Sequence, residues 1–235
     1  MSSPFAAYKK FAIVFAVLSA LILYIIYSLL KVTPTLPVIQ PTMVASELVD
    51  TTMQDVKKYH RIADWQLINQ NNDTITQDYY KDKIYVADFF FTTCQTICPI
   101  MTGNMAQLQK ELRGDDDVLL LSHSVTPEYD TPAILKDYAR KKGVNASKWN
   151  LVTGPKKDIY ELARKSYLAV KDEGSGGKYD MIHTENFMLV DKKRQVRGSY
   201  DGTDPEDIDR LLEDIEYLKE EYRPKKTFMQ RLFGR

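Results

Sequence analysis

The feature that most constrains this chain is a run of twenty residues without a charged side chain, residues 11–30. As a helix rising about 1.5 Å per residue, the run reaches about 30 Å, the thickness of the hydrocarbon core of a bilayer. Tyr8, Tyr24 and Tyr27 lie toward its ends, where aromatic side chains favour the membrane interface. A cleaved signal peptide normally has a shorter apolar stretch and a small-residue cleavage site, so the run favours one uncleaved transmembrane helix.

The cations beside this run predict how the chain is oriented. Lys9 and Lys10 precede the run, and Lys31 alone follows it. Because flanking cations favour the cytoplasmic side, we expect residues 1–10 in the cytoplasm and the rest of the chain outside it. The absence of an Arg- and Ser-rich stretch before the run favours a bacterial inner (plasma) membrane over a mitochondrial one. The functional part is therefore expected in an oxidising, periplasmic space.

The balance of charge disfavours nucleic acid as a partner. The 235 residues include 32 basic and 32 acidic side chains, so the formal net charge is zero. A nucleic-acid binder normally carries a basic excess or stripe. The hydrophobic content of 44% and the aromatic content of 11% are typical of a globular protein.

The exported part divides into three stretches. Residues 31–60 contain three prolines, which favour extended backbone, and are interpreted as a tether. Residues 61–223 have the size of one domain. Residues 224–235 form a basic tail.

Strands and helices alternate along the predicted domain. Apolar runs predict strands and apolar residues at helical spacing predict helices. This alternation, closed by a hairpin and a helix, predicts an α/β fold with three layers around a central mixed sheet. The strands are expected within 63–76 (two short ones), 83–91, 117–125, 149–154, 186–191 and 195–202, and the helices over 98–114, 130–143, 155–167 and 204–222.

The two cysteines, Cys94 and Cys98, lie where a buried strand is followed by the first long helix. Pro99 suits the first turn of a helix, which places Cys98 at the helix N-terminus. Unpaired N–H groups there stabilise a thiolate and lower its pKa. On one helical turn the two β-carbons are about 5–6 Å apart, which permits a disulfide, a redox pair or a shared soft metal ion.

A third ligand for such a metal would come from a histidine. His60 ends the tether, and His123 ends a buried strand, where a hydrogen-bonded core imidazole is the favoured interpretation. His183 follows a glycine-rich loop, on a segment that can close over the thiols. Two thiolates and one imidazole suit copper or zinc by ligand softness, and copper fits an incomplete, exchangeable ligand shell best. Met101 and Met105 follow the helical spacing of core residues.

The stretch 60–202 resembles the SCO/SenC family, membrane-tethered copper proteins that help to assemble cytochrome c oxidase. The resemblance rests on "DFFFTTCQTICPIM", "SVTPEYDTP" and "IHTENFMLVDKKRQVRGSYDG". It implies a thioredoxin-like fold. It also implies a copper site formed by Cys94, Cys98 and His183.

Two positions depart from the pattern of that family. Many members carry Asp where this chain has Thr126, and an acidic residue is common where this chain has Ile182. Neither residue is an expected ligand. Both departures bear on partner docking or on copper affinity.

Two functions follow from these observations. The first is a copper chaperone that delivers one copper ion to the dinuclear copper centre of a respiratory oxidase subunit. The second is a thiol–disulfide oxidoreductase that uses Cys94 and Cys98 and needs a thiol reductant as partner. A peroxidase of the peroxiredoxin class is disfavoured, because the Pro and the Thr or Ser that should precede the reactive cysteine are missing. A purely structural disulfide would close a tiny loop and stabilise little.

Overall fold

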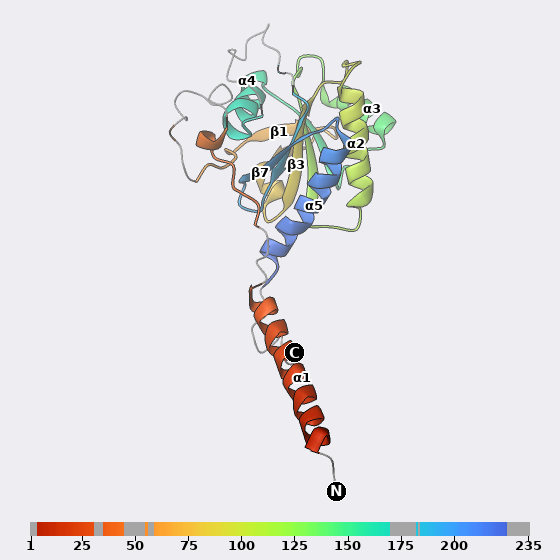
Figure 1. Cartoon of the computed structure of the whole chain (residues 1–235). Helices are drawn as coiled ribbons and strands as arrows, with labels where there is room; N and C mark the ends of the chain where they lie inside the picture. Colours follow the sequence, from red (N-terminus) through yellow and green to blue (C-terminus); the bar gives the residue numbers. More distant parts are fainter. Residues whose placement is uncertain are drawn as a thin grey trace. The chain divides into compact units, whose positions relative to one another are not determined.

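The structure is a computed structural model that describes residues 4–30, 35–44, 55, 59–169, 182 and 184–224. The chain divides into two units, Met1–Pro34 and Thr35–Arg235. The first unit contains the helix α1 (Pro4–Leu30), drawn in red in Figure 1. Among the described residues, no helix is both long enough and apolar enough to cross a membrane. The structure gives no support to the predicted span, which stays a prediction from the sequence.

A seven-stranded sheet forms the centre of the second unit. Its strands are β1 (Gln66–Asn69), β2 (Thr74–Thr76), β3 (Ile84–Phe90), β4 (Val118–Ser124), β5 (Trp149–Thr153), β6 (Asn186–Val190) and β7 (Val196–Asp201). The strand order is β2-β1-β5-β4-β3-β6-β7. The central strands β3, β4 and β5 are parallel, and the flanking pairs are antiparallel. The predicted mixed sheet is confirmed.

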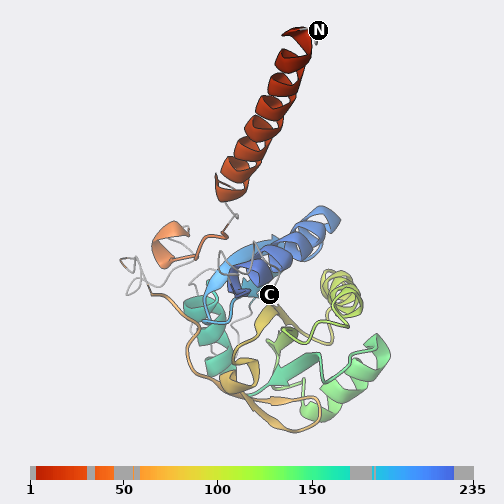
Figure 2. The ribbon, with the colours of Figure 1, turned by 90° about the horizontal axis from the view of Figure 1, so that it is seen from below.

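Helices cover both faces of this sheet. They are α2 (Cys98–Glu111), α3 (Pro132–Lys142), α4 (Lys156–Glu161) and α5 (Pro205–Tyr222), with short 3-10 turns at Pro41–Met43 and Gln77–Tyr80. In Figures 1 and 2, α2, α3 and α5 lie on one face and α4 lies on the other. The helix predicted over 155–167 is α4 followed by a π-helical turn, Leu162–Ser166.

The ends of α3 and α5 follow from local sequence. The Thr131 side chain accepts the N–H of Ile134 and caps the start of α3. Gly143, with φ of 70°, ends the same helix in the left-handed conformation that glycine adopts without strain. The side chain of Asp204 accepts the N–H of Glu206 and caps α5.

The sheet separates two apolar layers. Every residue of β3 and β4 is buried, as the near-continuous apolar runs predict for strands covered on both faces. Alternate residues of β3 face opposite layers: Phe89 packs with the residues of α4, and Phe90 packs with α2, α3 and α5. Met101 and Met105 are fully buried in this second layer, so their assignment as core residues is confirmed.

Part of the predicted tether lies against the domain. We name residues 35–44 the strap. The guanidinium of Arg197 donates to the carbonyl oxygens of Leu36 (2.6 Å) and Pro37 (3.2 Å). The N–H of Ile39 donates to the carbonyl of Val196 at 2.8 Å. The domain therefore begins at the strap, well before residue 61.

Candidate metal and thiol site

Both cysteines lie in the connection between β3 and α2. Cys98 is the first residue of α2 and Pro99 is the second, as predicted. Cys94 is half-buried, whereas Cys98 is only 3% exposed. Neither cysteine is in a disulfide. The site thus has one solvent-accessible sulfur, that of Cys94, and one buried sulfur, that of Cys98.

Hydrogen bonds converge on the sulfur of Cys94. The backbone N–H of Cys98 donates to Cys94 Sγ at 3.5 Å, and the hydroxyl of Thr96 lies 3.6 Å from the same sulfur. Partial burial raises the pKa of Cys94, but hydrogen bonds from the Cys98 thiol, from the Cys98 and Thr96 backbones and from the Thr96 hydroxyl outweigh it. The resulting pKa is about 7, so Cys94 is about half thiolate at neutral pH.

Cys98 has the opposite character. Burial, together with the hydrogen bond that its thiol shares with Cys94, raises the pKa of Cys98 to about 12. The prediction that the helix N-terminus acidifies Cys98 is therefore wrong. The first N–H of α2 points to the sulfur of the preceding turn, so the helix end stabilises the thiolate of Cys94 and leaves Cys98 protonated.

A buried carboxylate holds the start of the cysteine connection. Asp130 is fully buried and accepts the N–H of Thr92 at 3.1 Å as well as the Thr92 hydroxyl. The hydroxyls of Ser124 (2.6 Å) and Thr126 (3.1 Å) donate to the same carboxylate. Asp130 thereby ties the connection two residues before Cys94 to the end of β4. No role was predicted for Asp130 from the sequence, although it lies inside the stretch "SVTPEYDTP".

The departure at Thr126 has a structural explanation. Its hydroxyl is a donor to Asp130, so it adds to the set of groups that satisfy this buried carboxylate. A carboxylate at position 126 would face Asp130 and repel it unless one of the two took a proton.

A second buried acid, Asp88, lies on β3, the strand that precedes the cysteines. It is 1% exposed, and its Oδ1 has no hydrogen-bond partner within the described residues. Burial raises its pKa to about 7, against a weaker opposing effect of a hydrogen bond from Ser122. The charge of Asp88 adds to the high pKa of Cys98. The sequence signal for this group was a single acid inside the apolar run "KIYVADFFF".

His123 is a core residue. It is 0% exposed, its Nδ1 lies 3.2 Å from the carbonyl oxygen of Asp88, and its ring stacks on Phe89 with centroids 4.9 Å apart. Burial lowers its pKa to about 4. Phe89 belongs to the layer opposite that of Cys98, so the imidazole faces away from the thiols. The interpretation of His123 as a hydrogen-bonded core imidazole is confirmed.

Of the other two histidines, the structure describes His60 but not His183. The ring of His60 is bound through Nε2 to the carbonyl oxygen of Ser166 at 2.8 Å. His183, the expected third ligand, lies outside the described residues. Its neighbour Ile182 is 4% exposed and belongs to the core, and the Thr184 hydroxyl donates to a backbone carbonyl at 3.1 Å. An acid in place of Ile182 would thus be buried, which explains an apolar residue there.

The structure brings the two expected sulfur ligands together. Within the part of the chain that it describes, no group of three His, Cys, Asp or Glu side chains could hold a metal ion. Two soft donors on one turn are an incomplete ligand set, and they fit a soft cation that a third donor completes.

A family model matches most of this chain. The model for SCO1/SenC matches residues 53–220. The SCO1 protein homolog of Bacillus subtilis (strain 168) is 35% identical over 149 residues, which are 63% of this chain and 77% of that protein.

Solved structures show the same likeness. A SCO1/SenC family lipoprotein from Bacillus anthracis has a TM-score of 0.61 at 34% identity, covering 68% of this chain and 95% of that one. BsSco, a member of the Sco family of cytochrome c oxidase assembly proteins with an identified disulfide switch, has a TM-score of 0.57 at 32% identity, covering 68% and 93%. Copper-bound ScoI of Bradyrhizobium japonicum has a TM-score of 0.54 at 24% identity, covering 68% and 100%, and supports the thioredoxin-like fold alone.

Proposed function

Since the chain belongs to the SCO1/SenC family, we propose that it carries one copper ion on Cys94, Cys98 and His183. It delivers this copper to the dinuclear copper centre of a cytochrome c oxidase subunit. The observation that carries the proposal is the pair of sulfurs at the β3–α2 junction, joined by the hydrogen bond from the N–H of Cys98 to Cys94 Sγ. Family members have been solved with copper bound, which supports copper as the cargo.

The protonation states of the two thiols suit a cargo that must leave again. Cys94 is partly ionised at neutral pH and is the first donor available to an arriving metal. Cys98 holds its proton and must release it to become a ligand. Because removal of this proton costs free energy, Cys98 binds a metal less tightly than a free thiolate would. This favours transfer by stepwise replacement of ligands.

The proposed acceptor follows from the family. A relative with 32% identity belongs to the cytochrome c oxidase assembly proteins. We infer the same acceptor class for this chain. A thiol reductant is the second partner, because the pair must be reduced before it takes copper.

We also propose that residues 11–30 anchor the chain in the inner membrane, with the N-terminus in the cytoplasm and the domain outside. The charge-free run and its flanking lysines support this arrangement. The side chains of residues 28–30, at the end of the run, lie outside those that the structure describes. An anchored domain would reach an acceptor subunit in the same membrane.

The different acidities of the two thiols favour thiol–disulfide exchange as a second candidate function. The thiolate of Cys94 would attack one sulfur of a target disulfide, form a mixed disulfide and release the other target sulfur as a thiolate. Cys98 would then lose its proton and attack Cys94 Sγ, which releases the second target thiolate. The target gains two electrons, the pair becomes a disulfide, and an external thiol must reduce it again.

Copper titration tests the first function. A chain that begins at Thr35 keeps the strap, whereas one that begins at Met43 loses the contacts of Arg197. We expect one copper per chain with an intense thiolate-to-copper absorption, which Cys94→Ser abolishes and His183→Ala weakens.

His60→Gln is the matched control, because that ring binds a backbone carbonyl and the copper absorption should stay. Copper binding that His183→Ala leaves intact would refute His183 as a ligand. A chain that binds no copper but turns over a disulfide substrate would establish the second function instead.

A further inference from the structure

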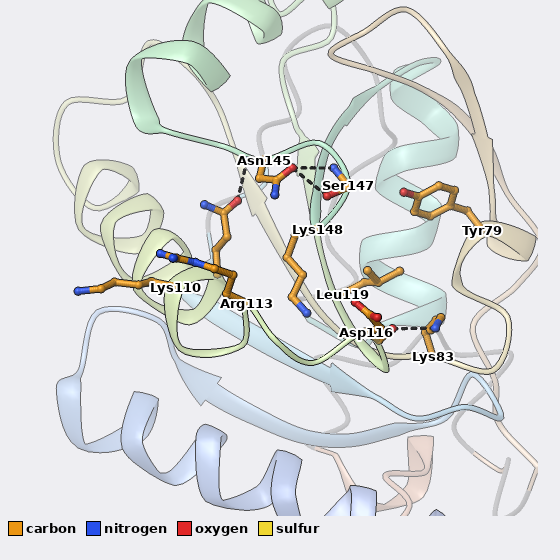
Figure 3. Close-up of a pocket in the computed structure, with 10 residues that line it drawn as sticks. Tyr79, Lys83, Lys110, Arg113, Asp116, Leu119, Asn145, Ser147 and Lys148 are labelled. Carbon is orange, nitrogen blue, oxygen red and sulfur yellow. Dashed lines mark hydrogen bonds between the residues drawn. The ribbon is translucent and has the colours of Figure 1, made fainter.

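A hollow of about 520 Å³ lies on the domain at the end of the sheet remote from the cysteines (Figure 3). Lys83 precedes β3, Leu119 begins β4 and Lys148 precedes β5, so the hollow opens at the amino ends of the parallel strands. The cysteines follow the carboxyl end of β3. Seven residues of strand, about 23 Å, separate the two places.

Four cations line this hollow. Lys110 and Arg113, from the C-terminal part of α2 and the turn after it, lie on one side, Lys83 lies on the other, and Lys148 extends between them (Figure 3). Among the lining residues only Asp116 carries a carboxylate. The chain as a whole has no net charge, so this concentration of positive charge is local.

The surrounding acids neutralise this positive charge only in part. The carboxylate of Asp117 lies 3.9 Å from Lys83 Nζ. The ammonium of Lys148, a residue 7% exposed, donates to the backbone carbonyl of Asp115, and that of Lys83 donates to the carbonyl of Asp116 at 2.7 Å. The carboxylate of Asp115 is instead paired with Lys219. Burial lowers the pKa of Lys148, against the opposing effect of the charges of Asp115 and Asp116.

Two of the cations have no competing partner. Within the described residues, the side chains of Lys110 and Arg113 make no hydrogen bond or ion pair. An arginine fork and an ammonium on one side of a hollow suit the oxygens of a phosphate group. The lining carries four cations and the carboxylate of Asp116, and Lys83 also pairs with Asp117. The remaining positive charge favours a ligand with more than one negative charge, and diphosphates carry two or more within a small volume.

We propose that this basic hollow binds an anion that bears phosphate, either a soluble diphosphate or the headgroup of an anionic phospholipid. The volume is within the range of small-molecule sites. Binding here is independent of the thiol pair, because the two sites lie at opposite ends of the sheet.

Calorimetric titration of the full chain with inorganic pyrophosphate, in a neutral detergent, tests the proposal. The doubly substituted chain Lys110→Gln/Arg113→Gln should bind pyrophosphate at least tenfold more weakly than the unsubstituted chain. The control Lys136→Gln/Lys157→Gln removes the same charge from exposed positions of α3 and α4 and should stay within twofold. The copper absorption should be the same in all three chains, which separates this test from that of the proposed function.

Amine labelling of Lys110, read by mass spectrometry, distinguishes the two sources of phosphate. Protection by pyrophosphate alone assigns the hollow to a soluble diphosphate. Protection by phosphatidylglycerol in the micelle, but not by phosphatidylcholine, assigns it to a lipid headgroup. If neither pyrophosphate nor phosphatidylglycerol protects Lys110, or if the control Lys136→Gln/Lys157→Gln loses as much affinity, the proposal is overturned.

Discussion

The chemistry of the thiol pair is set by which sulfur the helix end contacts. Four residues separate Cys94 from Cys98, and this spacing puts the first free N–H of α2 on the sulfur of the earlier residue. The later residue loses its contact with water. The sulfur of Cys94 therefore reacts first and that of Cys98 second. Both a metal carrier and a disulfide reductase can use this order.

Alkylation measures this difference directly. At pH 7 a thiol with a pKa of about 7 is half ionised, whereas one with a pKa of about 12 is ionised to about one part in 10⁵. We expect iodoacetamide to modify Cys94 at least a hundredfold faster than Cys98, with a midpoint near pH 7, as read by mass spectrometry of the reduced chain. Equal rates for the two thiols would contradict the assignment.

The Asp130 carboxylate and its donors from Thr92, Ser124 and Thr126, which we name the clamp, give a prediction for stability. Asp130→Asn replaces one carboxylate oxygen by an NH2 group, which cannot accept from the buried donors, including Thr92 and Ser124. We expect a loss of about 2–4 kcal/mol in the free energy of unfolding, measured with denaturant. Asp137→Asn, at an exposed site on α3, should change it by less than about 0.5 kcal/mol. A similar small change at both sites would exclude the clamp.

Two buried groups predict how stability depends on pH. The pKa of Asp88 is raised to about 7, so between about pH 4 and 7 the folded chain holds a proton that the unfolded chain has lost, and stability falls as pH rises. The pKa of His123 is lowered to about 4, so between about pH 4 and 6.5 the unfolded chain holds the extra proton, and stability rises with pH. The two slopes nearly cancel from pH 4 to 6.5.

Asp88→Asn removes the contribution of Asp88, which falls as pH rises, and leaves that of His123, which rises with pH. Relative to the unsubstituted chain, we expect its unfolding free energy to gain about 1.4 kcal/mol per pH unit between pH 4 and 6.5. Denaturant unfolding at several pH values provides the measurement, and every other titrating group cancels in the difference. A difference that stays constant with pH would mean that Asp88 is ionised in the folded chain.

At the scale of elements, the sequence predicts well what depends on short-range patterns. The order of strands and helices, the start of α2 at Cys98 and the caps at Thr131 and Asp204 all follow from spacing, proline and capping residues. The clamp could not be predicted in this way. Its donors come from the ends of two different strands, which only the parallel pairing of β3 with β4 brings together.

The same reasoning explains the two other failures at this scale. The pKa of Cys98 depends on how completely its side chain is buried, and the spacing of the two cysteines does not predict that burial. The strap looks like a tether because its prolines exclude regular structure, yet its carbonyl groups are bound by Arg197, a residue 160 positions later. A segment without regular secondary structure can still be held against the domain by hydrogen bonds.

Removal of the strap should therefore weaken the domain. A chain that begins at Ala45 lacks the carbonyl oxygens of Leu36 and Pro37, so the guanidinium of Arg197 keeps only its pairs with Asp191 and Glu221. We expect a loss of about 1–3 kcal/mol, or a few degrees in Tm. A chain that begins at Thr35 is the reference in calorimetry. Equal Tm values for the two chains would show that the strap contributes nothing.

At the scale of the whole molecule, the thiol site and the basic hollow occupy opposite ends of one sheet. This separation would allow the proposed copper acceptor to approach the cysteines while the far end of the domain binds the proposed phosphate ligand. It also means that a ligand in the hollow would leave the thiols accessible. The side of the membrane on which the thiols lie then decides whether the proposed delivery is possible at all.

The chain carries its own reporter for that question, because it has only two cysteines. The variant Cys98→Ser leaves Cys94 as the single thiol, half-buried and still within reach of the N–H at position 98. If residues 11–30 span the membrane with the N-terminus inside, a membrane-impermeant maleimide should label Cys94 in intact spheroplasts as fully as in permeabilised ones. The double variant Cys94→Ser/Cys98→Ser sets the background. Labelling only after permeabilisation would place the domain in the cytoplasm, where the thiols could not meet the exported face of an oxidase subunit, and the proposed copper delivery would fall together with the orientation.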